Sequence, residues 1–194
     1  MTELIEQLEN PCTDEYEKLK EFVLSEQMKW NFYESTYSDR TDKTQTKEIP
    51  LHSHMIMQRP YPPEIPYSII KSDLFLQVDE VLRQIFSYNK MRVYVIYRIN
   101  FNATFFNKST QTTPWHTDLD IPHKNLIIYM NKFKSGQTLV KKGDVIEKSS
   151  PKEDEIIMFD GDLDHCHTVP KEDDRRVVLV VNCHCSSEGR ARHL

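Results

Sequence analysis

The 194-residue sequence is poor in glycine, has no excess of basic residues and contains no long apolar run. Only four glycines, beside ten prolines, argue against a glycine-rich nucleotide-binding fold. Thirty acidic residues against 25 basic ones give a net charge of −5, which disfavours nucleic acid as a partner because a nucleic-acid coat needs a broad cationic surface. No stretch approaches the ~20 consecutive apolar residues that span a bilayer, so we expect no membrane segment.

A secretory signal is also missing, because the first ten residues carry Glu3, Glu6 and Glu9 and neither a basic start nor an apolar stretch. We therefore expect a cytoplasmic protein whose four cysteines are thiols rather than disulfides. Nine phenylalanines, nine tyrosines and two tryptophans supply bulky side chains for a core. The length is that of one domain, and nothing in the sequence indicates an oligomeric state.

Helical patterns precede strand patterns along the chain. Thr13 can cap a helix over residues 13–27, and apolar residues at helical spacing predict a second helix over residues 73–86, capped by Ser72. Runs rich in β-branched and aromatic residues then predict strands over residues 91–102, 125–130, 138–140, 156–159 and 177–182. We expect an α+β chain, mainly β, in which the helices pack on an antiparallel sandwich or barrel.

Two segments of the strand-rich half combine imidazole and carboxylate groups. His116 and Asp118 are separated by one residue, so an extended strand would point both side chains to the same side. His165 and His167 follow a later apolar strand. Two histidines and one carboxylate on one face of a metal leave the other face open, as non-haem Fe(II) oxygenases require. This donor set favours Fe(II) over zinc bound by thiolates.

A pair of arginines, Arg175 and Arg176, opens the last apolar run. Arginine is rarely buried unless it is paired, and its planar guanidinium suits bidentate binding of a carboxylate. Neighbouring residues of a strand point to opposite faces, so only one of the two can face a given pocket. Arg176 shares its face with Asn182, whose polar side chain suits a pocket wall. We prefer Arg176 for this role and expect Arg175 to be solvated.

The ordered set of motifs resembles the 2-oxoglutarate and Fe(II)-dependent oxygenases, and most closely their prolyl-hydroxylase-like branch, which includes small phage and microbial proteins. The resemblance covers residues 97–183. Residues 128–131 and 135–138 are similar to that family's tyrosine-leucine-asparagine strand and the glycine turn after it. Residues 159–161 resemble the segment that leads to the distal histidine, and residues 176–179 resemble the strand that binds the tail of 2-oxoglutarate.

This resemblance implies a double-stranded β-helix, a jelly-roll sandwich whose mouth holds the metal, with N-terminal helices packed on one sheet. The chain would form a single oxygenase domain over residues 1–194. Within it, residues 1–90 would supply helical support and loops, residues 91–185 the metal-binding β core and residues 186–194 a tail.

The resemblance also assigns the metal ligands. His116, Asp118 and His165 would bind Fe(II). His167 is the alternative to His165, because the spacing from Phe159 favours His165 whereas a shorter gap to the arginine pair would favour His167.

The co-substrate site is implied in the same way. Arg176 would pair with the distal carboxylate of 2-oxoglutarate, and Tyr129 would donate a hydrogen bond to that carboxylate. Asn102 or Asn100 would line the same pocket.

The activity that the resemblance implies is that of an Fe(II)- and 2-oxoglutarate-dependent dioxygenase. Such an enzyme uses O2, hydroxylates a C–H bond and releases succinate and CO2, and its chemistry is compatible with ascorbate as a supporting reductant. The closest resemblance favours prolyl or other side chains of a protein or peptide as substrate, and a small molecule remains open.

Two other interpretations stay open. One is a double-stranded β-helix that binds a metal or ligand without catalysis. The other is a small zinc-stabilised domain that uses residues 183–185 (Cys-His-Cys) together with Cys166 and His167, although this spacing matches no common zinc module. His52 and His54 lie in a segment that we predict to be irregular and exposed to solvent.

Overall fold

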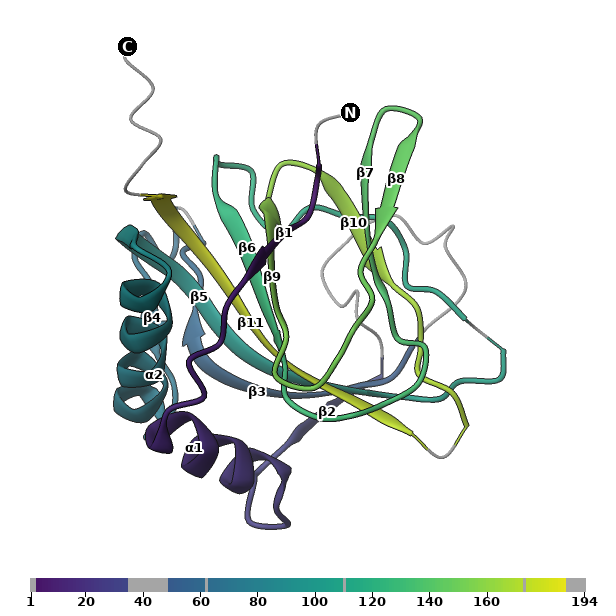
Figure 1. The fold of residues 1–194 in the computed structure, drawn as a ribbon, viewed down its shortest axis with the longest axis horizontal. Coiled ribbons are helices and arrows are strands. Elements are labelled where there is room, and N and C mark those ends of the chain that lie inside the picture. Colours follow the sequence, from purple (N-terminus) through teal and green to yellow (C-terminus); the bar gives the residue numbers. More distant parts are fainter. Residues whose placement is uncertain (1–2, 35–48, 62, 110, 173, 188–194) are drawn as a thin grey trace.

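The protein is mainly β in the computed structural model, which describes residues 3–34, 49–61, 63–109, 111–172 and 174–187 (Figure 1). The elements in chain order are β1 (Glu6–Leu8), α1 (Asp14–Leu24), β2 (Asn31–Tyr33), β3 (Leu51–Gln58), β4 (Ile69–Ile70), α2 (Phe75–Tyr88), β5 (Met91–Phe105), β6 (Lys124–Tyr129), β7 (Thr138–Lys142), β8 (Val145–Lys148), β9 (Ile156–Asp160), β10 (Asp164–His167) and β11 (Arg175–Ser187). None of the helices in the described part of the chain is long and apolar enough to cross a membrane.

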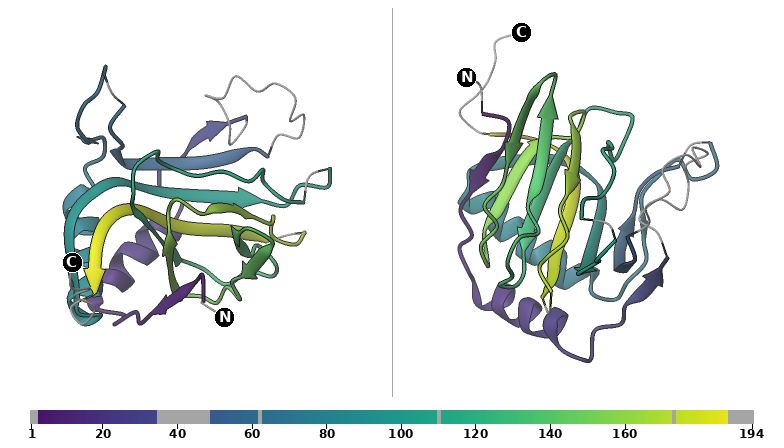
Figure 2. Two further views of the ribbon diagram at one scale, coloured as in Figure 1. Left: turned by 90° about the horizontal axis from the view of Figure 1, so that it is seen from above. Right: turned by 90° about the vertical axis from the view of Figure 1, so that its right-hand side faces the viewer.

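Within the described residues, the strands form two antiparallel sheets. The large sheet has the order β1-β9-β6-β11-β5-β3-β2, with β4 paired to β3, and the small sheet has the order β10-β7-β8 (Figure 1). The two longest strands, β5 and β11, pair along most of their length and bend together (Figure 2). Strands adjacent in the large sheet are mostly distant in sequence, as in a jelly roll. The predicted fold, a double-stranded β-helix, is confirmed.

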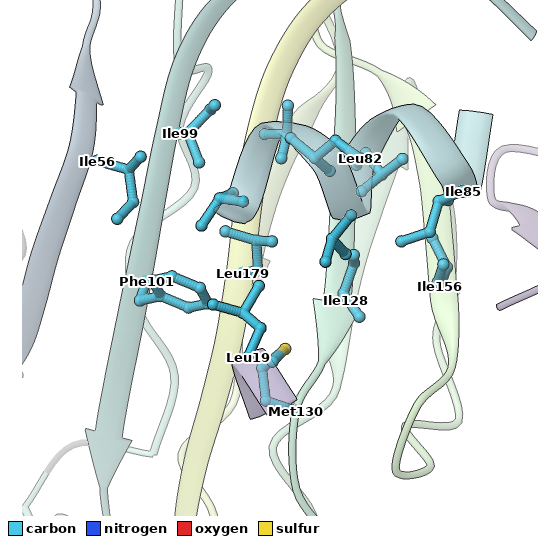
Figure 3. Packing of buried hydrophobic residues seen from close by; sticks show 14 of the residues in the cluster. Leu19, Ile56, Leu82, Ile85, Ile99, Phe101, Ile128, Met130, Ile156 and Leu179 are labelled. Atoms are coloured by element: carbon cyan, nitrogen blue, oxygen red, sulfur yellow. The ribbon is translucent and has the colours of Figure 1, made fainter. Parts of the chain in front are cut away.

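Both helices pack on the side of the large sheet that faces away from the small sheet (Figure 1). The labelled side chains of this core include Leu19, Leu82 and Ile85 from the helices and Ile99, Phe101, Ile128, Ile156 and Leu179 from the sheet (Figure 3). Full burial of one such side chain stabilises the fold by roughly 1.5–3 kcal/mol. The predicted packing of helices on one sheet is therefore correct, and it anchors the strands that carry the site.

Both helices start within two residues of the positions predicted from the sequence. The Thr13 side chain accepts a hydrogen bond from the Tyr16 N–H at the start of α1, as expected. The second helix begins at Phe75, two residues later than predicted, because Ser72 accepts from the Leu74 N–H in a turn that precedes the helix.

Alternation along β11 separates the helix-packed core from the interior of the sandwich. Val177, Leu179 and Val181 belong to the core under the helices. Val178 and Val180 point the other way, into a smaller apolar cluster between the sheets and toward a cavity. One strand thus supports the sheet with one face and builds a binding site with the other.

The expectation for His52 and His54 is wrong, because both lie in strand β3, which pairs with β5. The His54 ring nitrogens lie 2.6 Å from the Lys29 carbonyl oxygen and 2.7 Å from the Ser72 hydroxyl. Strand β3 mixes polar and apolar residues; Ile56 is buried in the core under the helices, and the strand pairs with β5, which is distant in sequence. Strand β11 extends to Ser187, while residues 188–194 lie outside the described residues, so the division of the chain into support, β core and tail stays a prediction.

Candidate metal centre and its cavity

A cavity of about 540 Å³ lies between the two sheets, within the range typical of small-molecule sites. Its wall includes most of the residues that the sequence singled out. These are Asn100, Asn102, His116, Asp118, His165, His167 and Arg176. Residues from β5, β10, β11 and the segment before β6 are thereby brought into one site.

His116 and His165 are joined by reciprocal backbone hydrogen bonds. The N–H of each donates to the carbonyl oxygen of the other, at 3.0 and 2.9 Å. This isolated β-bridge places the ring centroids 4.4 Å apart. The His165 Nε2 atom lies 3.7 Å from Asp118 Oδ2, and ligand atoms of all three residues lie within 4.8 Å of one another. The backbone itself therefore sets the spacing of the two imidazoles.

Backbone carbonyls also orient both rings. Nδ1 of His116 lies 3.1 Å from the Pro114 oxygen, and Nδ1 of His165 lies 3.2 Å from the Leu163 oxygen. A carbonyl can only accept, so Nδ1 is the donor in both hydrogen bonds, and Nε2 is the ring nitrogen that remains available to a metal. Burial lowers the pKa of His165 to about 4, so that ring is neutral at physiological pH and suited to bind a metal.

Asp118 is ionised although only 11% of its side chain is exposed. Arg98 Nη1 lies 3.3 Å from Oδ1, and the Asn182 amide donates to Oδ2 at 3.0 Å. Burial alone would raise the pKa of this carboxyl, but Arg98, followed by His165, His116 and the Asn182 hydrogen bond, holds it well below its usual range. Two imidazoles and one ionised carboxylate converge on one side of the cavity. This donor set fits Fe(II) with open positions for further ligands.

His167 lies in the cavity wall but outside this cluster. Its Nε2 atom lies 3.3 Å from the Thr104 hydroxyl and its Nδ1 atom 3.4 Å from the Thr113 hydroxyl. Burial lowers its pKa well below the usual value, and the nearby Arg176, His116 and His165 act in the same direction. The ring is therefore neutral. The geometry favours His165 over His167 as the second imidazole ligand.

Arg176 is buried and lines the cavity, with 3% of its surface exposed. Its Nε donates to the Gly136 carbonyl at 2.9 Å and its Nη2 to the Thr138 hydroxyl at 3.1 Å. Gly136 has φ +67°, and a Cβ there would lie 3.1 Å from Arg176 Cδ, so this turn needs glycine on both grounds. Arg175 does not line the cavity. Its guanidinium donates to the Leu24 carbonyl at the end of α1 at 2.8 Å, so this side chain is partly in contact with protein and not fully solvated as expected.

Tyr129 lies behind Arg176 and does not contribute to the cavity wall. Its hydroxyl lies 2.9 Å from the Thr138 hydroxyl and 2.8 Å from the Ser149 hydroxyl. The guanidinium of Arg176 sits over its ring, 5.5 Å from the centroid. A direct hydrogen bond from Tyr129 to a bound carboxylate stays a prediction. It would require the Tyr129 hydroxyl to accept from both neighbouring hydroxyls, so that its own proton is free to be donated.

Two arginines of the cavity wall, Arg59 and Arg98, were not found from the sequence. Arg98 precedes Asn100 and Asn102 on β5 at two-residue spacing, so the alternation that points the asparagines inward could have included it. Arg59 directly follows β3, and no signal marked it because β3 itself was not predicted.

Among the described residues, the cysteines form no cluster of zinc ligands with the histidines. Cys183 and Cys185 are free thiols whose sulfur atoms lie 3.7 Å apart, whereas His184 is exposed on the other face of β11. Cys166 lines the cavity, and burial raises the pKa of its thiol to about 11. A second group of possible ligands among the described residues, Cys12, Glu17 and Asp154, already has the Lys20 ammonium 2.8 Å from Asp154.

Solved structures of known oxygenases share this architecture. An oxidoreductase of the 2OG-Fe(II) oxygenase family from Burkholderia pseudomallei superposes with a TM-score of 0.65 at 13% identity, covering 97% of this chain and 89% of its own. The chain has the prolyl-hydroxylase-like fold of the 2-oxoglutarate and Fe(II)-dependent oxygenases. A Trichoplax adhaerens prolyl hydroxylase, solved in complex with a hypoxia-inducible-factor peptide fragment, gives a TM-score of 0.59 at 9% identity over 94% of this chain and 84% of its own.

A Pseudomonas putida prolyl-4-hydroxylase gives a TM-score of 0.52 at 13% identity, covering 94% of this chain and 93% of its own. No protein-family model and no curated protein matches the chain. The fold likeness therefore rests on structure, and the role of each residue rests on the geometry of this cavity.

The contact between Asn182 and Asp118 predicts a positioning role. Replacing Asn182 with alanine should weaken Mn²⁺ binding about tenfold, because partners that orient a ligating group typically contribute 10- to 100-fold to metal affinity. Titration calorimetry measures the change. Asn131→Ala is the matched control, since the Asn131 side chain bonds backbone atoms of Lys132, Arg175 and Val177 and does not line the cavity. Native-like affinity in Asn182→Ala would show that Arg98 alone orients the carboxylate.

Proposed function

We propose that the chain is an Fe(II)- and 2-oxoglutarate-dependent oxygenase that hydroxylates a C–H bond of a peptide or small molecule. One observation carries the proposal: the cavity that contains the His116, Asp118 and His165 cluster also contains the buried guanidinium of Arg176. Metal binding alone would not need that arginine. A carboxylate-binding group beside the metal site is what a 2-oxo acid with a second carboxylate requires.

His116, Asp118 and His165 would hold the iron. When bound with 2-oxoglutarate and O2, iron supplies the oxidising chemistry that places one oxygen atom in the substrate C–H bond and the other in succinate, with release of CO2. Nδ1 of each histidine stays bonded to its carbonyl, so both rings keep their orientation through the reaction. Asp118 stays ionised and balances one of the two positive charges of the metal.

Arg176 would bind the distal carboxylate of 2-oxoglutarate and fix which end of the molecule faces the metal. Its bonds to the Gly136 carbonyl and the Thr138 hydroxyl hold the guanidinium in place before the co-substrate arrives. Ile127, Phe159 and Val178 line the same cavity with apolar surface. They would exclude water around the co-substrate, which strengthens the ion pair.

A peptide is a candidate substrate because the Trichoplax neighbour was solved with a peptide fragment. The cavity is bordered by aromatic side chains, including Tyr33 and Tyr61, that suit an apolar side chain or ring. A small molecule fits the same volume.

The test is the stoichiometry of co-substrate turnover. Purified protein loaded with Fe(II) and 2-oxoglutarate should form succinate and CO2 in equal amounts when air is admitted, and a substrate should accelerate this. His116→Ala should lower the rate at least 100-fold, because it removes one of the three ligands. Val145→Ala, at an exposed position on β8, is the control. Binding of metal and 2-oxoglutarate without any succinate would instead support a non-catalytic binding protein.

A further inference from the structure

A second cationic site lies in the same cavity, on the Asp118 side. The Arg59 guanidinium donates to the Asp118 carbonyl oxygen, and Arg98 Nη1 lies 3.3 Å from the Asp118 carboxylate. Both arginines line the cavity. They are close enough that the charge of Arg59 opposes that of Arg98 and lowers its pKa, in addition to a larger effect of burial. Two guanidinium groups therefore share one small region beside the metal site.

This region is distinct from the Arg176 site. Arg98 pairs with Asn182 in the register of β5 and β11, whereas Arg176 pairs with Thr104. Arg98 and Arg176 thus lie six positions apart along the sheet, roughly 20 Å of strand at about 3.4 Å per residue. One 2-oxoglutarate molecule that uses Arg176 for its distal carboxylate leaves Arg59 and Arg98 to another ligand.

The charges of the cavity are not balanced. Among the described residues, its wall carries three arginines and one aspartate, with no lysine or glutamate. A divalent metal adds two positive charges and 2-oxoglutarate adds two negative ones, so a surplus of two positive charges remains. This surplus stands out in a chain whose net charge is −5. Arg59 and Arg98 are half-buried, and a partly desolvated guanidinium is stabilised when an anion pairs with it.

The existing contacts do not remove the surplus. Asp118 carries one negative charge, which the metal would share, and the Asp118 carbonyl that Arg59 contacts is neutral. Each guanidinium has five N–H donors. The described residues accept one hydrogen bond from Arg59 and one from Arg98, both at Asp118. With respect to the described residues, donors are therefore left at both guanidinium groups for a planar or tetrahedral anion.

We propose that the substrate carries an acidic group, a carboxylate or a phosphate, that Arg59 and Arg98 bind while the neighbouring C–H bond faces the metal site. This inference rests on the proposed function, because it names the substrate class of the same cavity. Leu51, Met55 and Tyr61 line the cavity and would contact the uncharged part of the substrate. Holding the acidic group beside Asp118 would fix the distance of the reacting carbon from the metal.

Binding of matched acids and amides tests the proposal. The panel consists of N-acetylated amino acids, short peptides and small phosphate monoesters, each beside a neutral amide or unphosphorylated form. Titration calorimetry is run on protein saturated with Mn²⁺ and 2-oxoglutarate, and in parallel on metal-free Arg176→Met protein. We expect at least one acid to bind about tenfold more tightly than its neutral form, the size typical of a charge-assisted hydrogen bond. Comparison of the affinities of the carboxylates with those of the phosphates shows which kind of anion the site binds.

The variants assign the effect to the two arginines. Arg59→Met and Arg98→Met should each lower the acid-to-neutral affinity ratio toward one. Arg83→Met, at an exposed arginine of α2, should keep the native ratio. Arg59 is the sharper test, because it contacts only the backbone of Asp118, whereas a change at Arg98 also affects the metal ligand.

Three results would overturn the inference. They are a panel in which no acid binds more tightly than its neutral form, a neutral compound that binds best, and an affinity ratio that Arg59→Met leaves unchanged. Failure of the proposed function is separable. Protein that forms succinate but prefers neutral ligands would contradict only this inference. Protein that binds acids through Arg59 and Arg98 but never forms succinate would contradict only the proposed oxygenase activity.

Discussion

Replacing Arg176 with methionine should raise the Kd for 2-oxoglutarate on the order of 100-fold, about 3 kcal/mol of binding free energy. The guanidinium is buried, lies in the cavity wall and is held by the Gly136 carbonyl and the Thr138 hydroxyl. A carboxylate that loses such a partner stays in a low-dielectric cavity without a counter-charge, and this is where an ion pair is strongest. Titration of the Mn²⁺-loaded protein with 2-oxoglutarate measures the loss.

The neighbouring arginine supplies the control. Arg175→Met removes the same charge from the same strand, but that side chain contacts the Leu24 carbonyl on the helix side of the sheet. We expect its 2-oxoglutarate affinity to stay within a few-fold of the native value. Arg176→Lys keeps the charge without the planar fork and should fall between the two. Equal affinities of Arg175→Met and Arg176→Met would place the distal carboxylate elsewhere. Thermal unfolding of each variant separates loss of binding from loss of fold.

Much of the fold could be predicted because several strands show a local run of apolar, β-branched residues in their sequence. The apolar, β-branched runs that become β6, β9 and β11 are buried, and their sequences show it. Strand β3 is harder to predict, because two histidines, a serine and a glutamine interrupt its apolar residues and it is held by pairing with β5. This strand depends on a partner strand more than 40 residues away in sequence, since His54, for example, pairs with Phe101. A local sequence pattern does not indicate such a contact.

The site divides in the same way. The spacing of His116 and Asp118 and the alternation around Arg176 are local properties, so the sequence indicated them. Other features of the site depend on tertiary contacts between segments that are distant in sequence. These are the backbone bridge between His116 and His165, the hydrogen bond from Asn182 to Asp118 and the contact of Arg59 with Asp118. These contacts determine which histidine lies next to Asp118 and the net charge of the cavity wall. They therefore influence which substrate binds more than which fold forms.

The choice between the two neighbouring histidines gives the second large prediction. His165→Ala should weaken Mn²⁺ binding by more than the roughly 10- to 100-fold that loss of an orienting partner costs, because it removes a ligand itself. His167→Ala should leave the Mn²⁺ affinity within about threefold. The reason is geometric: His165 Nε2 lies 3.7 Å from Asp118 Oδ2, while both nitrogens of His167 face threonine hydroxyls. Calorimetric titration of the two variants side by side measures the difference.

These variants form a matched pair, since both residues lie on β10, two positions apart and both in the cavity wall. His167→Ala also leaves the hydroxyls of Thr104 and Thr113 without an imidazole, so we expect its thermal stability to fall while its metal affinity is retained. The opposite ranking of metal affinities would assign the ligand role to His167. Because His116 is bonded through its backbone to His165, that result would also require β10 to shift its register on β7. A register shift of one or two residues exchanges many backbone contacts at once, and this is the physical ground for expecting His165.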